Sequence, residues 1–242
     1  MTPLTDLHRA HIGRTIWVIC SGASLSYVRH DFFADKLCIG VNETFRDFPT
    51  LYQTGTHHDH IDEALAAGCR VVVPAHACGF LDQPRIERDH PDLYTFPHAH
   101  NDLVTPFTAD QVDTPDRLFL SASSAAVAIH LAYYLGASAI MLCGMDGGLL
   151  DGHMNYPGYN RPEGEFAHCH PERGYTWAGH PRLTAHIVLA LIEAVRARGV
   201  HVHSLNPFFN FTLEDHRFAS LSEDLATTRS FLTHVESAHA ML

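Results

Sequence analysis

Short apolar runs alternate with amphipathic segments through the first third of the chain. Each run is four to seven residues long and ends in a small or polar residue, whereas the segments between them have the length of short helices. This alternation is typical of β-α units in a parallel sheet. The pattern predicts strands at residues 16–20, 36–42, 51–54 and 70–74, with helices at about 25–36 and up to about residue 67.

The same alternation returns in the second half of the chain. A strand-like run at 118–120 precedes a helix that is rich in small residues, and a strand and a further helix–strand pair follow. The expected segments are a helix through Leu135, a strand at 139–143, a helix from about Pro181 to Arg198, a strand at 200–205 and a C-terminal helix at 218–238.

Two stretches lack this periodicity, at about 75–117 and 147–179, and we expect them to be irregular insertions that form a lid or flap. The first is predicted to contain one short strand at 93–96. The sequence therefore predicts a single α/β domain over residues 1–242, with a mostly parallel twisted sheet of about five to seven strands. Helices should cover both faces, and the two long loops should lie over the edge formed by the C-terminal ends of the strands, where such sheets bind ligands.

The turn after the first strand has the composition of an anion site. It reads Ser21-Gly22-Ala23-Ser24, in which Gly22 lets the backbone approach a ligand and Ser24 can cap the following helix. A helix N-terminus presents free N–H groups and a positive dipole end. The turn is predicted to hold the phosphate or ribose of a nucleotide, and an ordinary tight turn is the alternative.

The end of the second predicted strand argues against a dinucleotide enzyme. The fingerprint of such enzymes has three glycines in the first turn and an acidic residue after the second strand, whereas this chain has one glycine and Asn42. A Walker sequence is also absent. Asn42 can still bond to a base or ribose edge, so it is a predicted nucleotide contact.

The amino-acid composition limits the classes of partner and the cellular compartment that we expect for this chain. The 16 Lys and Arg residues against 27 Asp and Glu give a formal charge of −11, which disfavours a nucleic-acid-binding surface. No apolar run approaches the ~20 residues of a membrane-spanning helix. The six cysteines form no C-x-x-C pair and the N-terminal residues lack a signal-peptide pattern, so we expect reduced cysteines and a cytoplasmic protein, with homo-oligomer formation left open.

Two further groups of residues could carry chemistry. Ser123 and Ser124 stand at the start of a predicted helix, where hydroxyls suit a ribose or phosphate, with helix capping as the alternative. Asp146 follows the strand at 139–143, where a carboxylate can bind a metal, orient a sugar hydroxyl or act as a base, with a structural Asx-turn as the alternative.

Histidines are abundant, at 21 of 242 residues, and several stand near predicted strand ends. His57, His58 and Asp59 could reach a substrate, and Asp146, Asp151 and His153 are candidate metal ligands, although their spacing matches no standard metal motif. His180 opens a long predicted helix, whose positive end favours the neutral imidazole that a general base requires.

Taken together, these motifs resemble the Rossmann-like family of archaeal 6-hydroxymethylpterin diphosphokinase-like proteins and the related bacterial sialyltransferases that use CMP-sialic acid. The likeness lies in six short motifs spread over about 16–207: the turn Cys20-Ser21-Gly22-Ala23-Ser24-Leu25, Asn42, Ser123-Ser124-Ala125, Leu142-Cys143-Gly144-Met145-Asp146, Gly179-His180, and the turn Leu205-Asn206-Pro207. The chain departs from the family in the first turn, where Ser21 and Ala23 replace an asparagine and a proline, and at Ser123-Ser124-Ala125, which replaces Thr-Ser-Gly.

The resemblance implies a transferase that binds a nucleotide-activated donor, with the turn, Asn42, Ser123 and Ser124 on the nucleotide and His180 as the general base. It implies tyrosines on the departing phosphate, for which Tyr156, Tyr159 and Tyr175 are candidates. The preferred hypothesis is a sialyltransferase-like glycosyltransferase that requires no cofactor and transfers a sugar to a small-molecule or glycan acceptor. The alternatives are a diphosphokinase that uses ATP and Mg²⁺, and a non-catalytic nucleotide-binding module.

Overall fold

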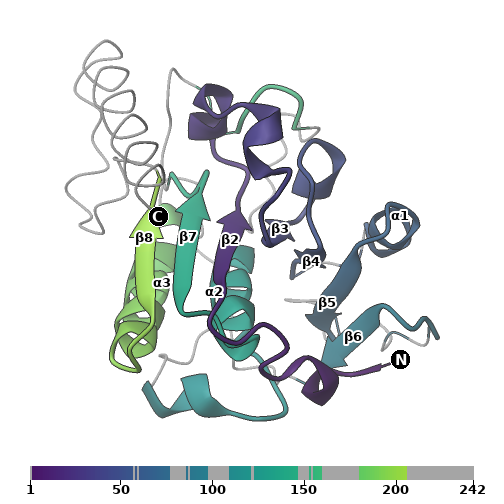
Figure 1. Cartoon of the computed structure of the whole chain (residues 1–242), viewed down its shortest axis with the longest axis vertical. Helices are drawn as coiled ribbons and strands as arrows, with labels where there is room; N and C mark the ends of the chain where they lie inside the picture. Colours follow the sequence, from purple (N-terminus) through teal and green to yellow (C-terminus); the bar gives the residue numbers. More distant parts are fainter. Residues whose placement is uncertain are drawn as a thin grey trace, which may run out of the picture.

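The computed structural model describes residues 2–56, 58, 60–76, 86, 88–97, 109–120, 123–146, 153, 155–159 and 180–205, with side chains in the last range from residue 188 onward. Within these residues a single eight-stranded sheet forms the centre of the molecule (Figure 1). The strands are β1 (Thr2–Pro3), β2 (Thr15–Ile19), β3 (Cys38–Val41), β4 (Tyr52–Thr54), β5 (Arg70–Pro74), β6 (Leu93–Phe96), β7 (Ala139–Cys143) and β8 (His201–Ser204).

Three α-helices and several 3-10 helices connect these strands. The α-helices are α1 (Ile61–Ala66), α2 (Ser124–Tyr134) and α3 (His180–Arg196). The 3-10 helices are η1 (Leu4–Leu7), η2 (Ala23–Tyr27), η3 (His30–Phe33), η4 (Thr44–Arg46) and η6 (Ala109–Asp113).

Every strand pair in the sheet is parallel, in the order β1-β6-β5-β4-β3-β2-β7-β8. The chain moves outward from β2 through β3, β4 and β5, and then returns across β2 to add β7 and β8 on the other side. The order therefore reverses between β2 and β7. In open parallel sheets, a crevice for ligands lies outside the C-terminal ends of the strands at such a reversal.

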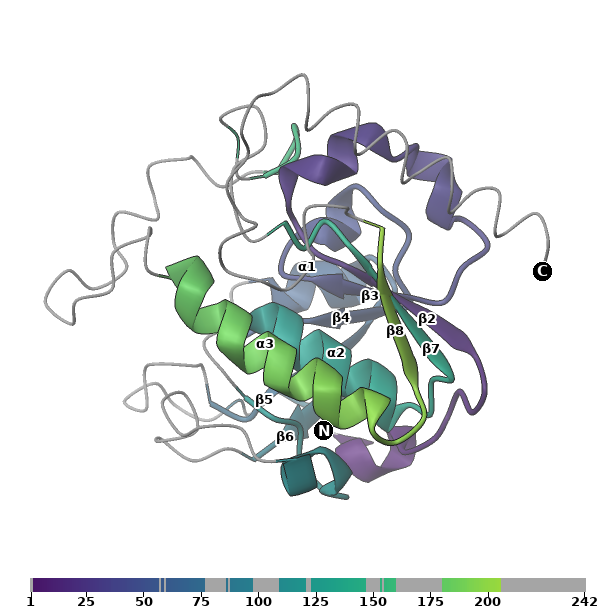
Figure 2. The same ribbon diagram turned by 90° about the vertical axis from the view of Figure 1, so that its left-hand side faces the viewer.

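Side chains alternate between two hydrophobic layers because successive residues of a strand point to opposite faces. In β2, Ile16 and Val18 pack under α2 and α3, whereas Trp17 and Ile19 pack against Leu25, Phe33 and Phe48. Figure 2 shows α2 and α3 side by side on one face of the sheet, with the short helices that follow β2 on the other. The expected coverage of both faces is confirmed.

The structure corrects the predicted elements in three places. The sheet has eight strands rather than five to seven, partly because the two-residue β1 pairs with β6. The expected helix at 25–36 is two 3-10 helices, η2 and η3, separated by an extended Val28. Residues 118–120 are buried but belong to no strand.

The remaining strands lie where the hydrophobic pattern predicts them, including β6 inside the first insertion. Most of the two predicted lid segments and the predicted C-terminal helix lie outside the described residues.

Candidate functional site

Five of the predicted polar positions meet at one edge of the sheet. Since all the strands are parallel, β2, β3, β4 and β7 end at the same edge, and α2 and α3 begin there. This edge carries the turn at residues 21–24, Asn42, Ser124 and Asp146. These residues therefore lie at one edge of the sheet, although up to 125 residues separate them in sequence.

The turn after β2 binds a carboxylate of the protein itself. Asp146 is 3 % exposed, and its Oδ2 accepts a hydrogen bond of 2.7 Å from the Ser24 backbone N–H. The Ser24 hydroxyl donates a second bond, of 2.5 Å, to Oδ1 of the same carboxylate. A carboxylate is the group that a positive helix end favours. The start of η2, predicted to receive a phosphate, is therefore already occupied by Asp146.

Ser24 does not cap the helix that follows β2, contrary to the sequence prediction. The residue at the N-cap of η2 is Gly22, which makes no side-chain capping bond, and Ser24 is the second residue of the helix. Its hydroxyl serves instead to hold Asp146.

Close packing explains the glycine in this turn. The Gly22 N–H donates to the Gly144 carbonyl at 2.7 Å, and a Cβ added at Gly22 would lie 2.5 Å from Cγ of Asp146 and would also overlap that carbonyl. The backbone φ of Gly22 is an ordinary −62°. Gly22 is therefore needed for close approach of the β2 and β7 loops rather than for an unusual backbone conformation.

Cys20, which precedes the turn, is a packed residue rather than a nucleophile. Burial, with a contribution from the nearby Asp146 carboxylate, raises the pKa of its thiol to about 12. The four cysteines among the described residues, Cys20, Cys38, Cys69 and Cys143, are free and buried.

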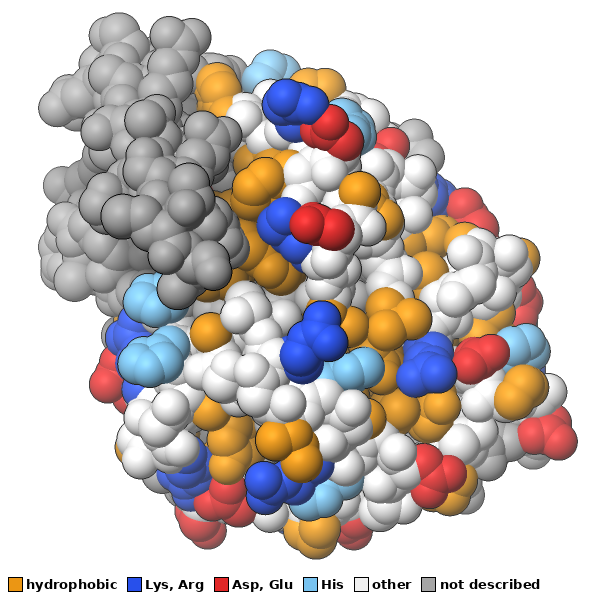
Figure 3. All heavy atoms as spheres, in the orientation of Figure 1, with side chains coloured by type: hydrophobic (Ala, Val, Ile, Leu, Met, Phe, Trp, Pro, Cys, Tyr) orange, Lys and Arg blue, Asp and Glu red, His pale blue; other side chains and the backbone are white. Residues whose placement is uncertain are grey.

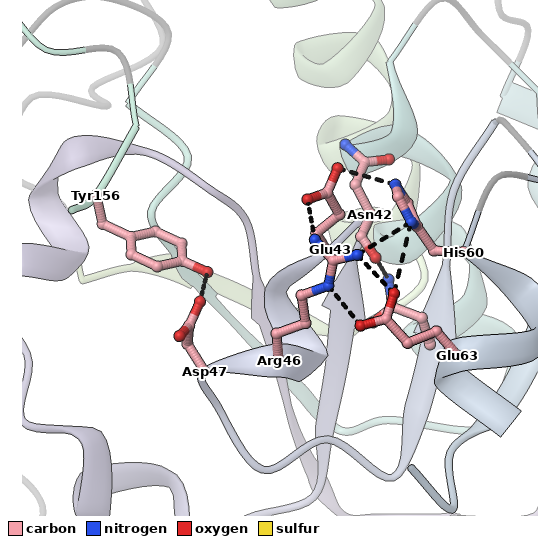
Figure 4. A network of polar contacts seen from close by, with 8 residues as sticks. Asn42, Glu43, Arg46, Asp47, His60, Glu63 and Tyr156 are labelled. Atoms are coloured by element: carbon pink, nitrogen blue, oxygen red, sulfur yellow. Dashed lines mark hydrogen bonds and ion pairs between the residues drawn. The ribbon is translucent and has the colours of Figure 1, made fainter. Parts of the chain in front are cut away.

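The side-chain amide of Asn42, at the same edge, has no hydrogen-bond partner among the described residues. Its backbone is left-handed, with φ of 57°, a conformation that Asn tolerates better than most residues. The Asn42 N–H donates to the Thr54 carbonyl at 2.9 Å, and the Asn42 carbonyl accepts from Nε2 of Gln53. No described residue bonds to the side-chain amide, which is partly exposed and stands clear of the dashed contacts in Figure 4.

The two serines before α2 join that helix to β4. Ser123 is the N-cap of α2 and makes no side-chain capping bond. The Ser124 hydroxyl lies 3.2 Å from both the backbone N–H and the hydroxyl of Thr56, two residues after β4. The first turn of α2 thus sits beside the ends of β3 and β4, close to Asn42.

Sequence reasoning missed a charged cluster beside Asn42 (Figure 4). Glu43 is 4 % exposed, and its carboxylate pairs with Arg46 at 2.6 Å and with Nε2 of His60 at 2.9 Å. Arg46 also donates to both carboxylate oxygens of Glu63, so its guanidinium lies between the two acids. These hydrogen bonds from Arg46 lower the pKa of Glu63. The cluster ties η4 to α1. The sequence offers a hint of this cluster, because the acidic Glu43 follows Asn42 directly and lies two positions beyond the end of β3.

Of the three candidate tyrosines, Tyr156 has its hydroxyl bonded within the protein. Tyr156 is 4 % exposed and packs against Phe48, and its hydroxyl donates to Oδ2 of Asp47 at 2.7 Å (Figure 4). Burial and the Asp47 carboxylate raise the pKa of Tyr156. Tyr159 packs on the ring of Tyr156. Tyr156 therefore braces the β3–β4 region, and its hydroxyl is already engaged.

Several predicted positions bear less directly on the edge. Nε2 of His58 donates to the Pro74 carbonyl at 2.9 Å, and His153 is exposed. His180 is the first residue of α3. His57, Asp59, Asp151 and Tyr175 lie outside the described residues, as does the side chain of His180.

Among the described residues, no group of three or more His, Cys, Asp or Glu side chains could hold a metal ion. The helices in this part of the chain are too short or too polar to cross a membrane. On the face in Figure 3, basic side chains are interspersed with acidic ones. The protein-family models contain no match to this sequence, and a search of curated proteins also found none.

Proposed function

We propose that the chain is a Rossmann-like transferase that binds a nucleotide-activated donor, and specifically a sialyltransferase-like glycosyltransferase that uses a nucleotide sugar. The observation that carries this proposal is the Asn42 amide. A polar group with both donor and acceptor capacity is held at the ligand edge of a parallel sheet, without a partner among the described residues. Such a group suits the edge of a nucleobase or ribose.

The nucleotide would lie across the ends of β2, β3 and β4. Asn42 would contact the base or ribose, and the Ser21 hydroxyl and the first turn of α2 at Ser123 and Ser124 would bind the phosphate. That helix has 11 residues and no side-chain cap, so its first N–H groups and its dipole favour an anion. The Ser24 N–H is not included, because it already binds Asp146.

The transfer step would use His180 as the general base. His180 would take the proton from the acceptor hydroxyl as the acceptor oxygen bonds to the anomeric carbon of the donor sugar. The bond from that carbon to the phosphate oxygen breaks, and the nucleotide leaves with its phosphate. Asp146 acts as a positioning residue that fixes the first turn through Ser24. Tyr159 and Tyr175 remain candidates for the phosphate.

The diphosphokinase alternative makes different demands on the same residues. It needs Mg²⁺ on oxygen ligands, for which Asp146 is the natural candidate. Both carboxylate oxygens of Asp146 accept hydrogen bonds from Ser24, which favours the glycosyltransferase hypothesis. The third hypothesis, a non-catalytic nucleotide-binding module, requires nucleotide binding at the same edge of the sheet but no general base at His180.

A thermal-shift panel separates these hypotheses. The purified protein is heated with CMP, CDP, UDP, GDP or ATP, each with Mg²⁺ or with EDTA. A ligand at 100 times its dissociation constant stabilises the folded state by about 2.7 kcal/mol. A metal-independent response to a cytidine nucleotide supports the proposal, a response to ATP that requires Mg²⁺ supports the diphosphokinase, and no response to any nucleotide contradicts both.

Two substitutions test whether nucleotide binding and sugar transfer depend on residues at this edge of the sheet. Asn42→Gly keeps the left-handed backbone but removes the amide, so nucleotide binding should weaken by about tenfold without loss of stability. His180→Ala should bind nucleotide normally and lose sugar transfer. Full binding by Asn42→Gly would remove Asn42 from the site, and full transfer by His180→Ala would remove the assigned base.

A further inference from the structure

A pocket lies at the opposite end of the sheet from Asn42, where the strands begin and α2 and α3 end. Its cavity volume is about 320 Å³, at the low end of the range of small-molecule sites. Its walls combine aromatic and aliphatic surface with two guanidinium groups. The lining includes His8, Arg9, Val112, Asp113, Tyr133 and Arg198.

Arg9 is held in an unfavourable backbone conformation at the mouth of this pocket. Its φ is 59°, in the left-handed region that a residue with a Cβ rarely adopts. Two backbone bonds fix the segment, from Arg9 N–H to the Tyr134 carbonyl at 2.9 Å and from His11 N–H to the Leu135 carbonyl at 2.7 Å. A glycine would satisfy the same bonds without strain, which directs attention to the Arg9 side chain.

Among the residues that line the pocket, one cation has no charged partner in the described part of the chain. Nε and Nη2 of Arg198 donate to Oδ2 of Asp113 at 2.7 and 2.5 Å, and the Tyr133 hydroxyl donates to Oδ1 at 2.7 Å. The hydrogen bonds from Arg198 and Tyr133 lower the pKa of Asp113, so this carboxylate stays ionised and neutralises Arg198. The Arg9 guanidinium has no hydrogen bond or ion pair with any described residue.

We propose that this pocket binds a small aromatic monocarboxylate. The planar fork of Arg9 matches a carboxylate in shape and charge, whereas the nearby Asp6, Asp110 and Asp116 side chains disfavour a ligand with more than one negative charge. The rings of His8 and Tyr133 and the side chain of Val112 offer a surface for a flat apolar body.

A phosphate monoester suits the pocket less well. It carries close to two negative charges at neutral pH. The pocket adjoins the C-terminal end of α2, where the helix dipole disfavours negative charge, and it already contains the Asp113 carboxylate. A single carboxylate therefore fits better than a doubly charged group.

The test measures binding of benzoate to the full chain by calorimetry, with phenyl phosphate and uncharged benzamide as comparison ligands. Arg9→Gln should weaken benzoate binding by about tenfold or more, because it removes a charge-assisted bond. Arg14→Gln is the matched control, because it removes the same charge from the same loop at an exposed residue that does not line the pocket. Arg9→Gly, which also relieves the backbone strain, should lose binding while remaining folded.

Benzoate should bind wild type about tenfold more tightly than benzamide, and the two should bind Arg9→Gln alike. Equal benzoate affinity for wild type, Arg9→Gln and Arg9→Gly, or no measurable binding at all, would overturn the proposal. Tighter binding of phenyl phosphate than of benzoate would overturn the assignment to a monocarboxylate. The result does not depend on nucleotide binding, because this pocket and Asn42 lie at opposite ends of the strands.

Discussion

The contact between Ser24 and Asp146 shows how residues that resemble ligand groups can serve each other instead. Both were predicted to face a nucleotide, one as part of a phosphate turn and one as a catalytic carboxylate. In the folded protein they form two hydrogen bonds across 122 residues of sequence. Asp146 stabilises the positive end of η2, and Ser24 provides polar partners for a buried acid that would otherwise be costly.

The close packing around the Ser24–Asp146 contact predicts that one methyl group added at Gly22 strongly destabilises the fold. In Gly22→Ala the new Cβ meets Asp146 and the Gly144 carbonyl, which are backbone or buried atoms that cannot simply move away. We expect a loss of about 2–4 kcal/mol in the free energy of unfolding, measured by urea denaturation.

Gly199→Ala is the matched control for this change. Gly199 has φ of 82° and no atom within 4 Å of an added Cβ, so only backbone strain of about 1 kcal/mol applies. Equal losses in the two variants would show that close packing does not explain Gly22.

The sequence located the candidate residues better than it assigned their contacts. Strand ends can be read from apolar runs, and parallel strands must end at one edge, so the placement of Asn42 and Asp146 at that edge follows from the sequence pattern. Which polar group bonds to which depends on distances between loops that the sequence pattern does not contain. For the same reason Tyr156 was taken as a phosphate ligand, although it packs on Phe48 and bonds to Asp47.

At the scale of elements, the predictions were correct where burial on both faces left a strong pattern. In β2 and β3 eight of nine residues are buried, and such strands read as continuous apolar runs. The two-residue β1 has no pattern of its own and exists through its pairing with β6. The segment at 25–36 is not one helix, because the extended backbone at Val28 interrupts it. This break is accompanied by packing of Phe33 in the core beside Trp17.

The cluster at Glu43 predicts how two neighbouring elements are held together. Glu43 and Glu63 both pair with Arg46, but the Glu43 side chain is 5 % exposed and the Glu63 side chain 48 % exposed. Replacing a buried acid leaves its partners unpaired in a poorly solvated place. Glu43→Gln should therefore cost about 2 kcal/mol or more of the free energy of unfolding.

Glu63→Gln is the matched control, because it removes the charge of the second acid that pairs with Arg46, at a solvated position. Its expected cost in the free energy of unfolding is below about 1 kcal/mol. Urea denaturation of both variants, with hydrogen exchange of α1 as a local readout, checks this difference. If the two substitutions cost the same, burial of Glu43 is not what secures α1 to η4.

At the scale of the whole molecule, 21 histidines and a formal charge of −11 make stability depend on pH in two opposing ways. Protonation of exposed histidines reduces net negative charge and its self-repulsion. His130 in α2 acts in the opposite direction. It is fully buried, its Nδ1 accepts from the Phe119 N–H at 2.6 Å, and its Nε2 donates to the Val112 carbonyl at 2.9 Å. These two bonds require the neutral ring.

Burial lowers the pKa of His130 from 6.5 to about 4. Between these values the unfolded chain takes up a proton at this position and the folded protein does not, so stability falls as pH falls through that window. Below about pH 4 both states are protonated and the contribution no longer changes. At about 1.4 kcal/mol per pKa unit, wild type should lose about 2 kcal/mol between pH 8 and pH 5 through this residue alone.

His130→Gln isolates this contribution, because glutamine keeps one donor and one acceptor but does not titrate. Its absolute stability will differ, so the quantity to compare is the change in the free energy of unfolding between pH 8 and pH 5. The wild-type loss should exceed the loss in His130→Gln by about 2 kcal/mol, since the exposed histidines are common to both proteins and cancel. Identical pH profiles would mean that His130 takes up its proton in the folded state at an ordinary pH, and that residues 112–119 do not enclose it as the two hydrogen bonds require.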